Sequence, residues 1–496
     1  MKRTLRRLAL GLLAALLLLV AVVFGRTLMF TSVQVEAPRS TLEVDARQVA
    51  ERLAAASRFR TISLGGPGSE GIAPFLAMHD WLAQTYPRFH QTLKREVVGE
   101  GNLLFTWAGR DPARPPVLFI AHQDIVPVEK GTEQDWTHPP YAGRIAPCGD
   151  EPGDCVWGRG TIDMKAAMIG LYEGVERLLA AGYVPERSLM FAFAVDEETG
   201  GAGARATADM LEARGVRFEW TLDEGLLITD GIMPGLEGPA ALIGLSEKGY
   251  TTLELLARSE GGHSSMPPAV TAVSRLSRAI VRLQEDPFPR AIDGAVAEMF
   301  EAIGPELGFG QRLAFANRWL LDPVIVGQLA GGTSTNALLH TTQAPTMLSG
   351  SMQDNVLPQV ARAVINYRIH PRDSVESVLE RVTRVVDDEQ VTVRRLDGVT
   401  HTEPAKVSSP DGPGYRMVES AIRASFPEAV VASGLFIAAT DTRHFGRLAD
   451  NSYRFHPVRM KPGDGQRIHG TDERMRVADL AGLVQFYHHV LEAAGR

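Results

Sequence analysis

The chain has 496 residues, of which 45% are hydrophobic, and its formal net charge is −8. This length predicts two or more domains with a large buried core. The acidic balance, with no basic stripe beyond the first residues, argues against nucleic acid as a partner.

The N-terminal segment predicts a membrane anchor. Four basic residues in positions 1–7 precede an uninterrupted apolar run over 8–24. A membrane-spanning helix needs about 20 apolar residues, so this run lies near the short limit. Basic residues before the run keep the N-terminus in the cytoplasm. Because residues 24–30 lack a small-residue cleavage pattern, we expect a retained signal anchor over 1–25 rather than a cleaved signal peptide. The body would then be exported, to the periplasm or the extracellular space, behind a connector over 26–44.

The region 45–247 predicts an α/β domain. Strand-like apolar runs alternate with helical patterns, which is typical of a mostly parallel sheet. The clearest helix begins after Asp163, where Met168, Leu171, Val175 and Leu178 recur at helical spacing before Gly182. We expect residues 401–496 to complete the same domain.

The two cysteines, Cys148 and Cys155, bracket a short polar turn. A disulfide across this turn fits an oxidising compartment. A pair of free thiols is the alternative, and it would suit the cytosol. Neither cysteine lies in a motif with catalytic character.

The middle segment, 248–400, predicts a separate α+β unit inserted into the first domain. Its expected elements are strands 251–259, 346–352, 361–370 and 391–396 and helices over 272–284 and 375–385. The order β-α-β-β-α-β is the ferredoxin-like one. The stretch 286–332 is longer than this unit needs, so we expect an insertion there, helical over 300–319.

Acidic and imidazole side chains recur where strands or turns end. They lie in the phrases AHQD (121–124), GRGTIDMK (158–165), AVDEETGG (194–201), TLDEG (221–225) and RIHGTDE (467–473). Ligand-binding groups gather at the carboxyl ends of strands in open α/β sheets. Imidazoles and carboxylates together suit a divalent metal, zinc above all. Taken singly, each phrase has a simpler reading, such as a surface histidine, a solvated helix start or a helix cap.

This ordered set of phrases resembles the co-catalytic dizinc exopeptidase and amidohydrolase family that includes carboxypeptidase S, aminoacylase and succinyl-diaminopimelate desuccinylase. The resemblance covers residues 45–496 and is strongest for carboxypeptidase S and its fatty-acyl amino acid hydrolase relatives, through WGRGT (157–161) and RIHG (467–470). It implies an α/β catalytic domain of the zinc-exopeptidase type, an inserted ferredoxin-like lid or dimerisation domain, and two Zn²⁺ ions per subunit.

The resemblance also assigns roles in the metal site. His122 and Asp223 would bind one ion, Glu198 and His469 the other, Asp163 would bridge both, and Glu197 would be the general base. Asp124 would orient His122 by accepting its second ring N–H. Many relatives carry an acidic residue directly after the bridging aspartate, where this chain has Met164; we expect the carboxylate of Asp163 to suffice.

The lid carries a second set of candidates. In the family, the histidine of GGHSS (261–265) stabilises the oxyanion, which here would be His263. The phrases TSTNALL (333–339), NVLPQ (355–359) and ATDTRHF (439–445) imply substrate contacts from Asn336, Asn355, Thr440 and Arg443. Arg368 lies on one face of the strand 361–370 and is a candidate for a two-pronged contact with a substrate carboxylate. A plain surface arginine is the competing reading.

These features predict a membrane-anchored dizinc hydrolase that cleaves the amide bond before a C-terminal amino acid, as a carboxypeptidase S-like metallocarboxypeptidase does. An N-acyl (fatty-acyl) amino acid amidohydrolase is the alternative, since both reactions release the same amino acid from a small peptide or N-acyl substrate. A non-catalytic, peptidase-like binding domain is a third reading. A homodimer formed through the lid is also expected.

Overall fold

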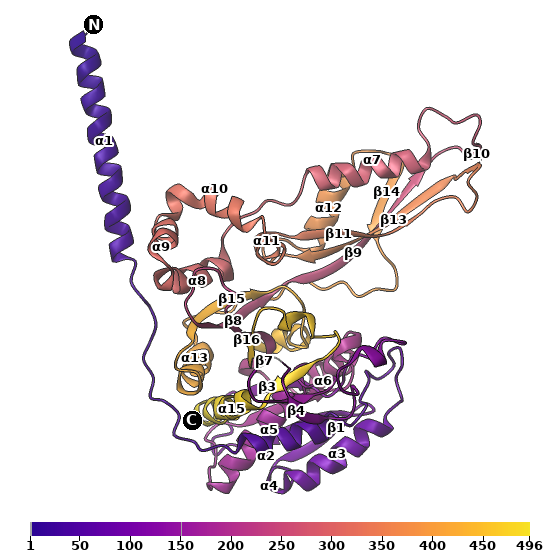
Figure 1. The fold of residues 1–496 in the computed structure, drawn as a ribbon. Coiled ribbons are helices and arrows are strands. Elements are labelled where there is room, and N and C mark those ends of the chain that lie inside the picture. The colour runs from indigo at the N-terminus through magenta and orange to yellow at the C-terminus, as the bar shows by residue number, and fades with distance from the viewer. Residues whose placement is uncertain (1, 150) are drawn as a thin grey trace.

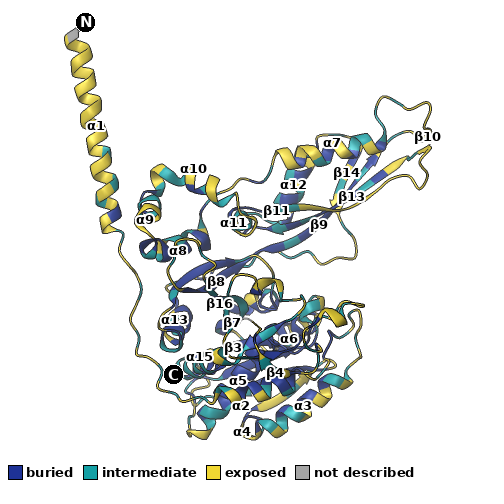
Figure 2. Ribbon diagram, viewed as in Figure 1, coloured by how far each residue is buried: buried dark blue, intermediate teal, exposed yellow. Residues whose placement is uncertain are grey.

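The computed structural model describes residues 2–149 and 151–496. Figure 1 shows three parts: a long N-terminal helix, a large body that holds both the N-terminal third and the C-terminus, and a lid that projects from the body. The body and the lid have separate hydrophobic cores. Figure 2 shows that buried residues fill both parts, whereas the N-terminal helix is exposed along most of its length.

An eight-stranded sheet forms the centre of the body. Its strand order is β1-β2-β6-β3-β7-β16-β8-β15. Strand β3 pairs in parallel with β6 and β7, β7 with β16, and β8 with β15, while β1, β2 and the β7–β8 hairpin add antiparallel pairs. The bounds are Lys94–Val98 (β1), Asn102–Trp107 (β2), Val117–His122 (β3), Leu189–Ala194 (β6), Phe218–Asp230 (β7), Pro239–Glu247 (β8), Val430–Phe436 (β15) and Ala449–Met460 (β16).

Helices cover both faces of this sheet because its central strands are apolar on both sides. Along β3, for example, Phe119 and Ala121 belong to one core cluster and Leu118 and Ile120 to another. The first cluster packs against α2 (Ala46–Ala56), α3 (Ala73–Thr85), α4 (Pro87–Thr92), α5 (Lys165–Ala180), α13 (Pro413–Ser425) and α15 (Leu480–Ala494). The second packs against α6 (Ala202–Ala213) and α14 (Thr442–Phe445). The α/β expectation for the body is confirmed.

A small sheet beside the body has the order β17-β5-β4, with β4 at Arg144–Pro147, β5 at Asp154–Trp157 and β17 at Arg474–Arg476. Cys148 and Cys155 form a disulfide across the turn between β4 and β5. Strand β17 brings the C-terminal phrase that contains His469 against the chain just before Asp163.

The lid consists of β9 (Gly249–Arg258), α7 (Ala272–Glu285), β11 (Thr342–Ser349), β13 (Val360–Ile369), α12 (Val375–Val386) and β14 (Val391–Arg395). All pairs in its sheet are antiparallel, in the order β11-β13-β9-β14, which is the ferredoxin-like arrangement. Both helices present apolar stripes to the sheet. A two-residue pair, β10 (Gly262–His263) with β12 (Val356–Leu357), lies at the far tip of the lid (Figure 1).

The insertion near 286–332 packs on the body rather than completing the lid. It forms α8 (Gly294–Ile303), α9 (Phe309–Ala316) and α10 (Arg318–Leu329), followed by α11 (Thr333–Leu339). The apolar positions Val296, Met299 and Ile303 of α8 belong to the core of the body, and α8 lies against β15. The sequence predicted an insertion here without saying where it packs; its apolar stripe is buried by the edge of the central sheet.

The N-terminal helix α1 spans Lys2–Met29, and its apolar part is long enough to cross a membrane, a test that a signal sequence also passes. It extends four residues past the expected anchor. The connector that follows lies along the body: Gln34 exchanges hydrogen bonds with both backbone groups of Val431 (2.8 and 3.0 Å), and the Ser40 N–H donates to the Ala424 carbonyl at 2.8 Å.

Candidate metal centre

Asp163 lies between His122 and His469, which are far apart in the sequence. Its Oδ1 is 3.0 Å from Nε2 of His122, at the end of β3, and its Oδ2 is 3.1 Å from Nε2 of His469. Each oxygen of one carboxylate therefore faces a different imidazole. This is the arrangement expected of a carboxylate that bridges two metal ions.

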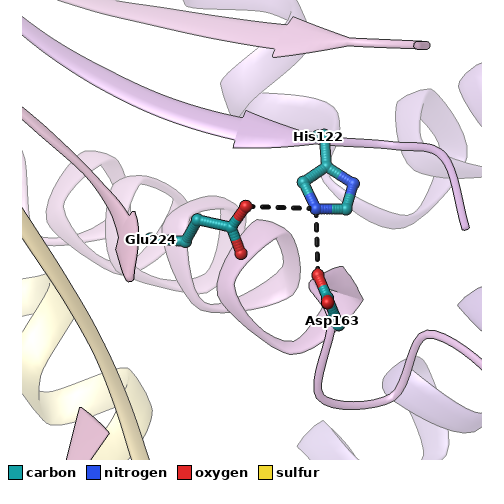
Figure 3. A group of neighbouring side chains, drawn as sticks. All are labelled: His122, Asp163 and Glu224. Carbon is teal, nitrogen blue, oxygen red and sulfur yellow. Dashed lines mark hydrogen bonds and ion pairs between the residues drawn. The ribbon is translucent and has the colours of Figure 1, made fainter. Parts of the chain in front are cut away.

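Two groups of metal-ligand side chains share Asp163. One consists of His122, Asp163 and Glu224 (Figure 3), and the other of Asp163, Glu198 and His469; within each group the ligand atoms lie within 4.8 Å of one another. Glu198 Oε2 is 3.1 Å from His469 Nε2. Its Oε1 is buried and has no hydrogen-bond partner in the described part of the chain. A buried carboxylate oxygen without a donor fits a site built for cations.

Glu224, rather than Asp223, joins the first group. Glu224 Oε1 is 3.4 Å from His122 Nε2. Asp223 turns away, and its Oδ2 accepts hydrogen bonds from the N–H and the hydroxyl of Thr442, both at 2.8 Å. The assignment of Asp223 to the metal site is therefore corrected. Neighbouring residues of a strand point to opposite faces, and the sequence DE did not reveal which acid faces the site and which faces α14.

Asp124 organises the other side of the site. One of its oxygens is 3.3 Å from His122 Nδ1. The same carboxylate accepts hydrogen bonds from the Ser63 hydroxyl (2.6 Å) and from the N–H groups of Glu197 (3.3 Å) and Glu198 (3.2 Å). Glu197 and Glu198 begin a 3₁₀ turn after β6 rather than continuing the strand.

A buried carboxylate that sequence reasoning missed supports the loop before Asp163. Glu473 is fully buried, and it accepts hydrogen bonds from the N–H groups of Gly160 (2.8 Å), Ile162 (2.8 Å) and Asp163 (3.1 Å). Arg159 pairs with it at 2.8 Å. Glu473 ends the phrase RIHGTDE, but nothing in the sequence distinguished it from the other acids there.

The buried carboxylates of the site would be stabilised in their charged forms by nearby positive charge. Burial raises the pKa of Glu197 well above its usual value and that of Glu224 to about 8. Hydrogen bonds to Asp163 and Glu198 raise the pKa of His469 to about 10. Burial opposes ionisation of Asp163, yet its hydrogen bonds with His122 and His469 lower its pKa overall. Glu197 and Glu224 thus bind protons more tightly than usual, and cations bound beside them would favour their charged forms.

A cleft of about 940 Å³ opens beside these groups. Asp163, Glu197, Glu198, Glu224 and His469 line its base, and residues from the lid and the body line its walls. The apolar residues that line it are Ile162, Leu227, Val399, Phe436, Ile437 and Ile468.

Two guanidinium groups face the same cleft. Arg368 stacks over the ring of Tyr250, with its Cζ 4.9 Å from the ring centroid. In the described part of the chain no group accepts a hydrogen bond from the guanidinium group of Arg368. Arg443 Nη2 lies 3.6 Å from Glu197 Oε1. Burial lowers the pKa of Arg368, and the nearby charge of Arg443 adds to this effect. The cleft is therefore lined both by acidic groups and by two guanidinium groups.

Four other candidates lie outside the cleft. Thr440 is buried and hydrogen-bonded to Glu247, and Asn336 accepts a hydrogen bond from Arg290 at 2.7 Å. His263 and Asn355 are exposed at the lid tip, where Nδ1 of His263 is 2.8 Å from the Ser265 hydroxyl. The structure brings neither of them to the metal groups of the same chain.

The fold and this site define a hydrolase of the metallopeptidase type. Residues 118–493 match the model of peptidase family M20/M25/M40, and the chain belongs to this family. Similar solved structures are the M20 family metallo-carboxypeptidase Sso-CP2 from Sulfolobus solfataricus (TM-score 0.63, 15% identity, 90% of this chain and 99% of that chain) and human carnosine dipeptidase 1 (TM-score 0.62, 16% identity, 91% and 96%).

Among curated proteins, the chain is similar to two kinds of relative. Probable carboxypeptidase S-like 2 of Dictyostelium discoideum is 36% identical over 90% of this chain and 85% of its own length. Carboxypeptidase S of Saccharomyces cerevisiae is 31% identical over 84% and 78%. The Homo sapiens N-fatty-acyl-amino acid synthase/hydrolase PM20D1 is 35% identical over 81% and 78%. The expected family is confirmed.

Proposed function

We propose that this protein is a dizinc hydrolase that cleaves the amide bond before a C-terminal amino acid, in the manner of carboxypeptidase S. The observation that supports it most is the pair of metal-ligand groups that share Asp163, in a cleft that Arg368 and Arg443 also line. His122 and Glu224 would hold one ion, Glu198 and His469 the other, and Asp163 both.

Two divalent ions bound there would supply Lewis acidity toward the scissile carbonyl and lower the pKa of a water between them. The protein's own groups do the rest. Glu197 takes the proton of the attacking water and returns it to the leaving nitrogen. Arg368 and Arg443 bind the carboxylate of the amino acid that leaves, since a guanidinium matches a carboxylate with two parallel hydrogen bonds.

Glu197→Gln tests this assignment. The variant should keep the zinc content of the wild type and lose about 10²–10⁴-fold in kcat, the usual contribution of a general acid–base group. Zinc content is measured by elemental analysis. Turnover is measured with a dipeptide that has a blocked N-terminus and a free C-terminus. Activity within about tenfold of the wild type in the metal-loaded variant would rule Glu197 out as the base.

A specific observation favours N-acyl amino acids as a second substrate class. The apolar side chains of Leu227, Val399, Phe436, Ile437 and Ile468 line the same cleft as the guanidinium groups. An acyl chain along these apolar side chains would gain the free energy of apolar burial, about 25 cal/mol per Å². A series of N-acyl amino acids of rising chain length distinguishes the two: kcat/KM that climbs with length favours the acyl substrate, and a flat series favours peptides.

We also propose that His263 acts on the cleft of a second copy. It lies at the exposed lid tip, and the lid's edge strand β11 exposes Met347 and Leu348, so pairing of two lids would bury both. A mixture of Glu197→Gln and His263→Ala chains tests this. Each variant alone should be nearly inactive, and the mixture should recover about a quarter of the wild-type rate, because half of the dimers are mixed and each has one complete site. No recovery would place His263 in its own chain's site or in none.

The body is further proposed to lie outside the cytoplasm, held to the membrane by α1. The apolar helix and the disulfide between Cys148 and Cys155 support this.

A further inference from the structure

The insertion helix α10 exposes a face that carries no charge. The exposed residues of this helix are Trp319, Leu320, Pro323, Val324, Gly327 and Gln328, at helical spacing. Trp319 is 57% exposed and Val324 58%. The neighbouring helix α8 behaves in the usual way for a soluble surface, since its exposed side chains are Glu298 and Glu301. The apolar face of α10 is therefore a local feature of the insertion.

Helix α9 and the start of α10 lie beside the end of α1. Asn317, between α9 and α10, is fully buried, and its side-chain N–H₂ donates to the Val23 carbonyl (3.1 Å) and to the Thr27 hydroxyl (3.2 Å). The Arg26 guanidinium donates to the Ala316 carbonyl at 3.1 Å. The rings of Phe24 and Phe309 are 6.1 Å apart. Specific hydrogen bonds thus fix the insertion against the last turns of α1 (Figure 1).

The contact with α1 determines how the insertion lies relative to a membrane that α1 crosses. Val23 and Phe24 are the last residues of the apolar run of α1. If this run spans a membrane, the membrane surface lies at the level of Val23 and Phe24. Phe309, whose ring contacts Phe24, then lies at the same level. Aromatic side chains are enriched at that level of a bilayer. Phe309 is 55% exposed.

The insertion is also fixed to the body. Its helix α8 lies against β15, and the Gln311 side chain of α9 donates to the Pro234 carbonyl at 3.1 Å. A membrane contact made by α9 and α10 would consequently set the orientation of the whole catalytic body.

We propose that Phe309, Trp319, Leu320, Pro323 and Val324 form a membrane-docking face that lies in the lipid interface beside α1. Amphipathic interfacial helices lie about 5–10 Å into the boundary between headgroups and acyl chains. The occupant is the bilayer because the face is continuous with a helix that is itself apolar enough to cross it. This proposal rests on the membrane anchor proposed above.

Site-directed fluorescence on the full chain tests it. Single cysteines replace Val324 in the face, Leu12 in α1, or Leu76 in α3; each is labelled with an environment-sensitive dye while the native disulfide stays oxidised. Leu76 is the matched control, since it is an apolar helix residue with 48% exposure on another part of the body. The chains are reconstituted in phosphatidylcholine–phosphatidylglycerol vesicles with and without brominated acyl chains. Each should keep wild-type turnover, because these positions lie outside the cleft.

The expected result is quenching by brominated lipid at positions 324 and 12 but not at 76. Quenching at position 12 alone would overturn the docking face and leave the anchor standing. Quenching at neither position would overturn both. A dye at position 324 that is shielded from water yet insensitive to brominated lipid would identify a second copy or another protein as the occupant, which also overturns the proposal.

A second pair of variants guards against disturbance by the dye. Leu320→Asp combined with Val324→Asp should lower the quenching of a dye at Phe309→Cys several-fold, whereas Leu76→Asp should leave it unchanged. Equal quenching in both backgrounds would show that the apolar face of α10 makes no contact with lipid.

Discussion

The Oε1 atom of Glu473 accepts a hydrogen bond from the backbone N–H of Asp163 at 3.1 Å, so the carboxylate of a residue near the C-terminus holds the main chain of the residue that both metal-ligand groups share. The same carboxylate also accepts the N–H groups of Gly160 and Ile162. It therefore fixes the main chain of the loop rather than a side chain. Ligand spacing at Asp163 depends on this support.

Removing that carboxylate should destabilise the fold and the metal site together. Glu473→Ala leaves Arg159 as a buried charge without its partner and three buried N–H groups without an acceptor. Breaking a buried ion pair in this way costs about 3–5 kcal/mol. Denaturant unfolding should show this loss, and zinc content should fall. Glu100→Ala, at an exposed position, is the control; similar unfolding midpoints for the two variants would contradict the supporting role.

Alanine substitutions of Glu224 and Asp223 should have different effects on zinc content. Glu224→Ala should lower bound zinc from two ions per chain toward one. Asp223→Ala should retain more zinc than Glu224→Ala, because its carboxylate contacts Thr442, and loss of such an outer partner typically lowers affinity about 10–100-fold. Elemental analysis after dialysis against a weak chelator measures the difference. A larger loss of zinc in Asp223→Ala would restore Asp223 as the ligand.

Arg368 should determine recognition of a free carboxylate. Arg368→Ala should raise KM steeply for substrates with a free C-terminus and change little for the same substrates with an amidated end. Arg368→Lys should recover only part, because an ammonium group lacks the planar two-pronged geometry. Arg443→Ala is the comparison, since Arg443 lines the same cleft. Equal losses on free and amidated substrates would instead indicate a general defect in the cleft.

Zinc binding should release protons. Without metal, the pKa of His469 is about 10 and that of Glu224 about 8, so both groups carry a proton at pH 7. Ligands must lose their protons to bind metal. Zinc affinity should therefore increase with pH from pH 6, less steeply above about pH 8, where Glu224 has lost its proton, and flatten only near pH 10. Titration calorimetry in buffers of different ionisation enthalpy counts the protons; an affinity that does not change with pH would show that the ligands are already deprotonated.

The order of elements was largely predictable because periodic apolar patterns are local. The lid's β-α-β-β-α-β order follows from the stripes of 272–284 and 375–385 and from short strands between them. The packing of the insertion was not predictable, because the burial of Val296 and Met299 depends on β15, more than a hundred positions later in the chain. Sequence patterns identify an apolar stripe but not the surface that covers it.

The candidate site divides in the same way. His122, Asp163, Glu198 and His469 lie in phrases whose order carried the family resemblance. Glu224 was missed by one position, since the twist and register of β7 decide which acid of the pair faces His122. Glu473 acts through its burial under the loop before Asp163, and burial of a single carboxylate leaves no pattern in the sequence. The position of His263 at the lid tip likewise depends on tertiary structure.

The connector's hydrogen bonds determine where a soluble form can be cut. The Gln34 side chain hydrogen-bonds to both backbone groups of Val431. The Ser40 N–H donates to the Ala424 carbonyl, and the Ser40 hydroxyl oxygen lies 2.7 Å from Nε2 of His489. Release of the body just after Phe30 would leave all of these partners in place. Cleavage nearer Asp45 would free both backbone groups of Val431 in the edge strand β15, and unpaired backbone groups at a sheet edge favour aggregation. Natural shedding or recombinant secretion should therefore succeed only with the first kind of terminus.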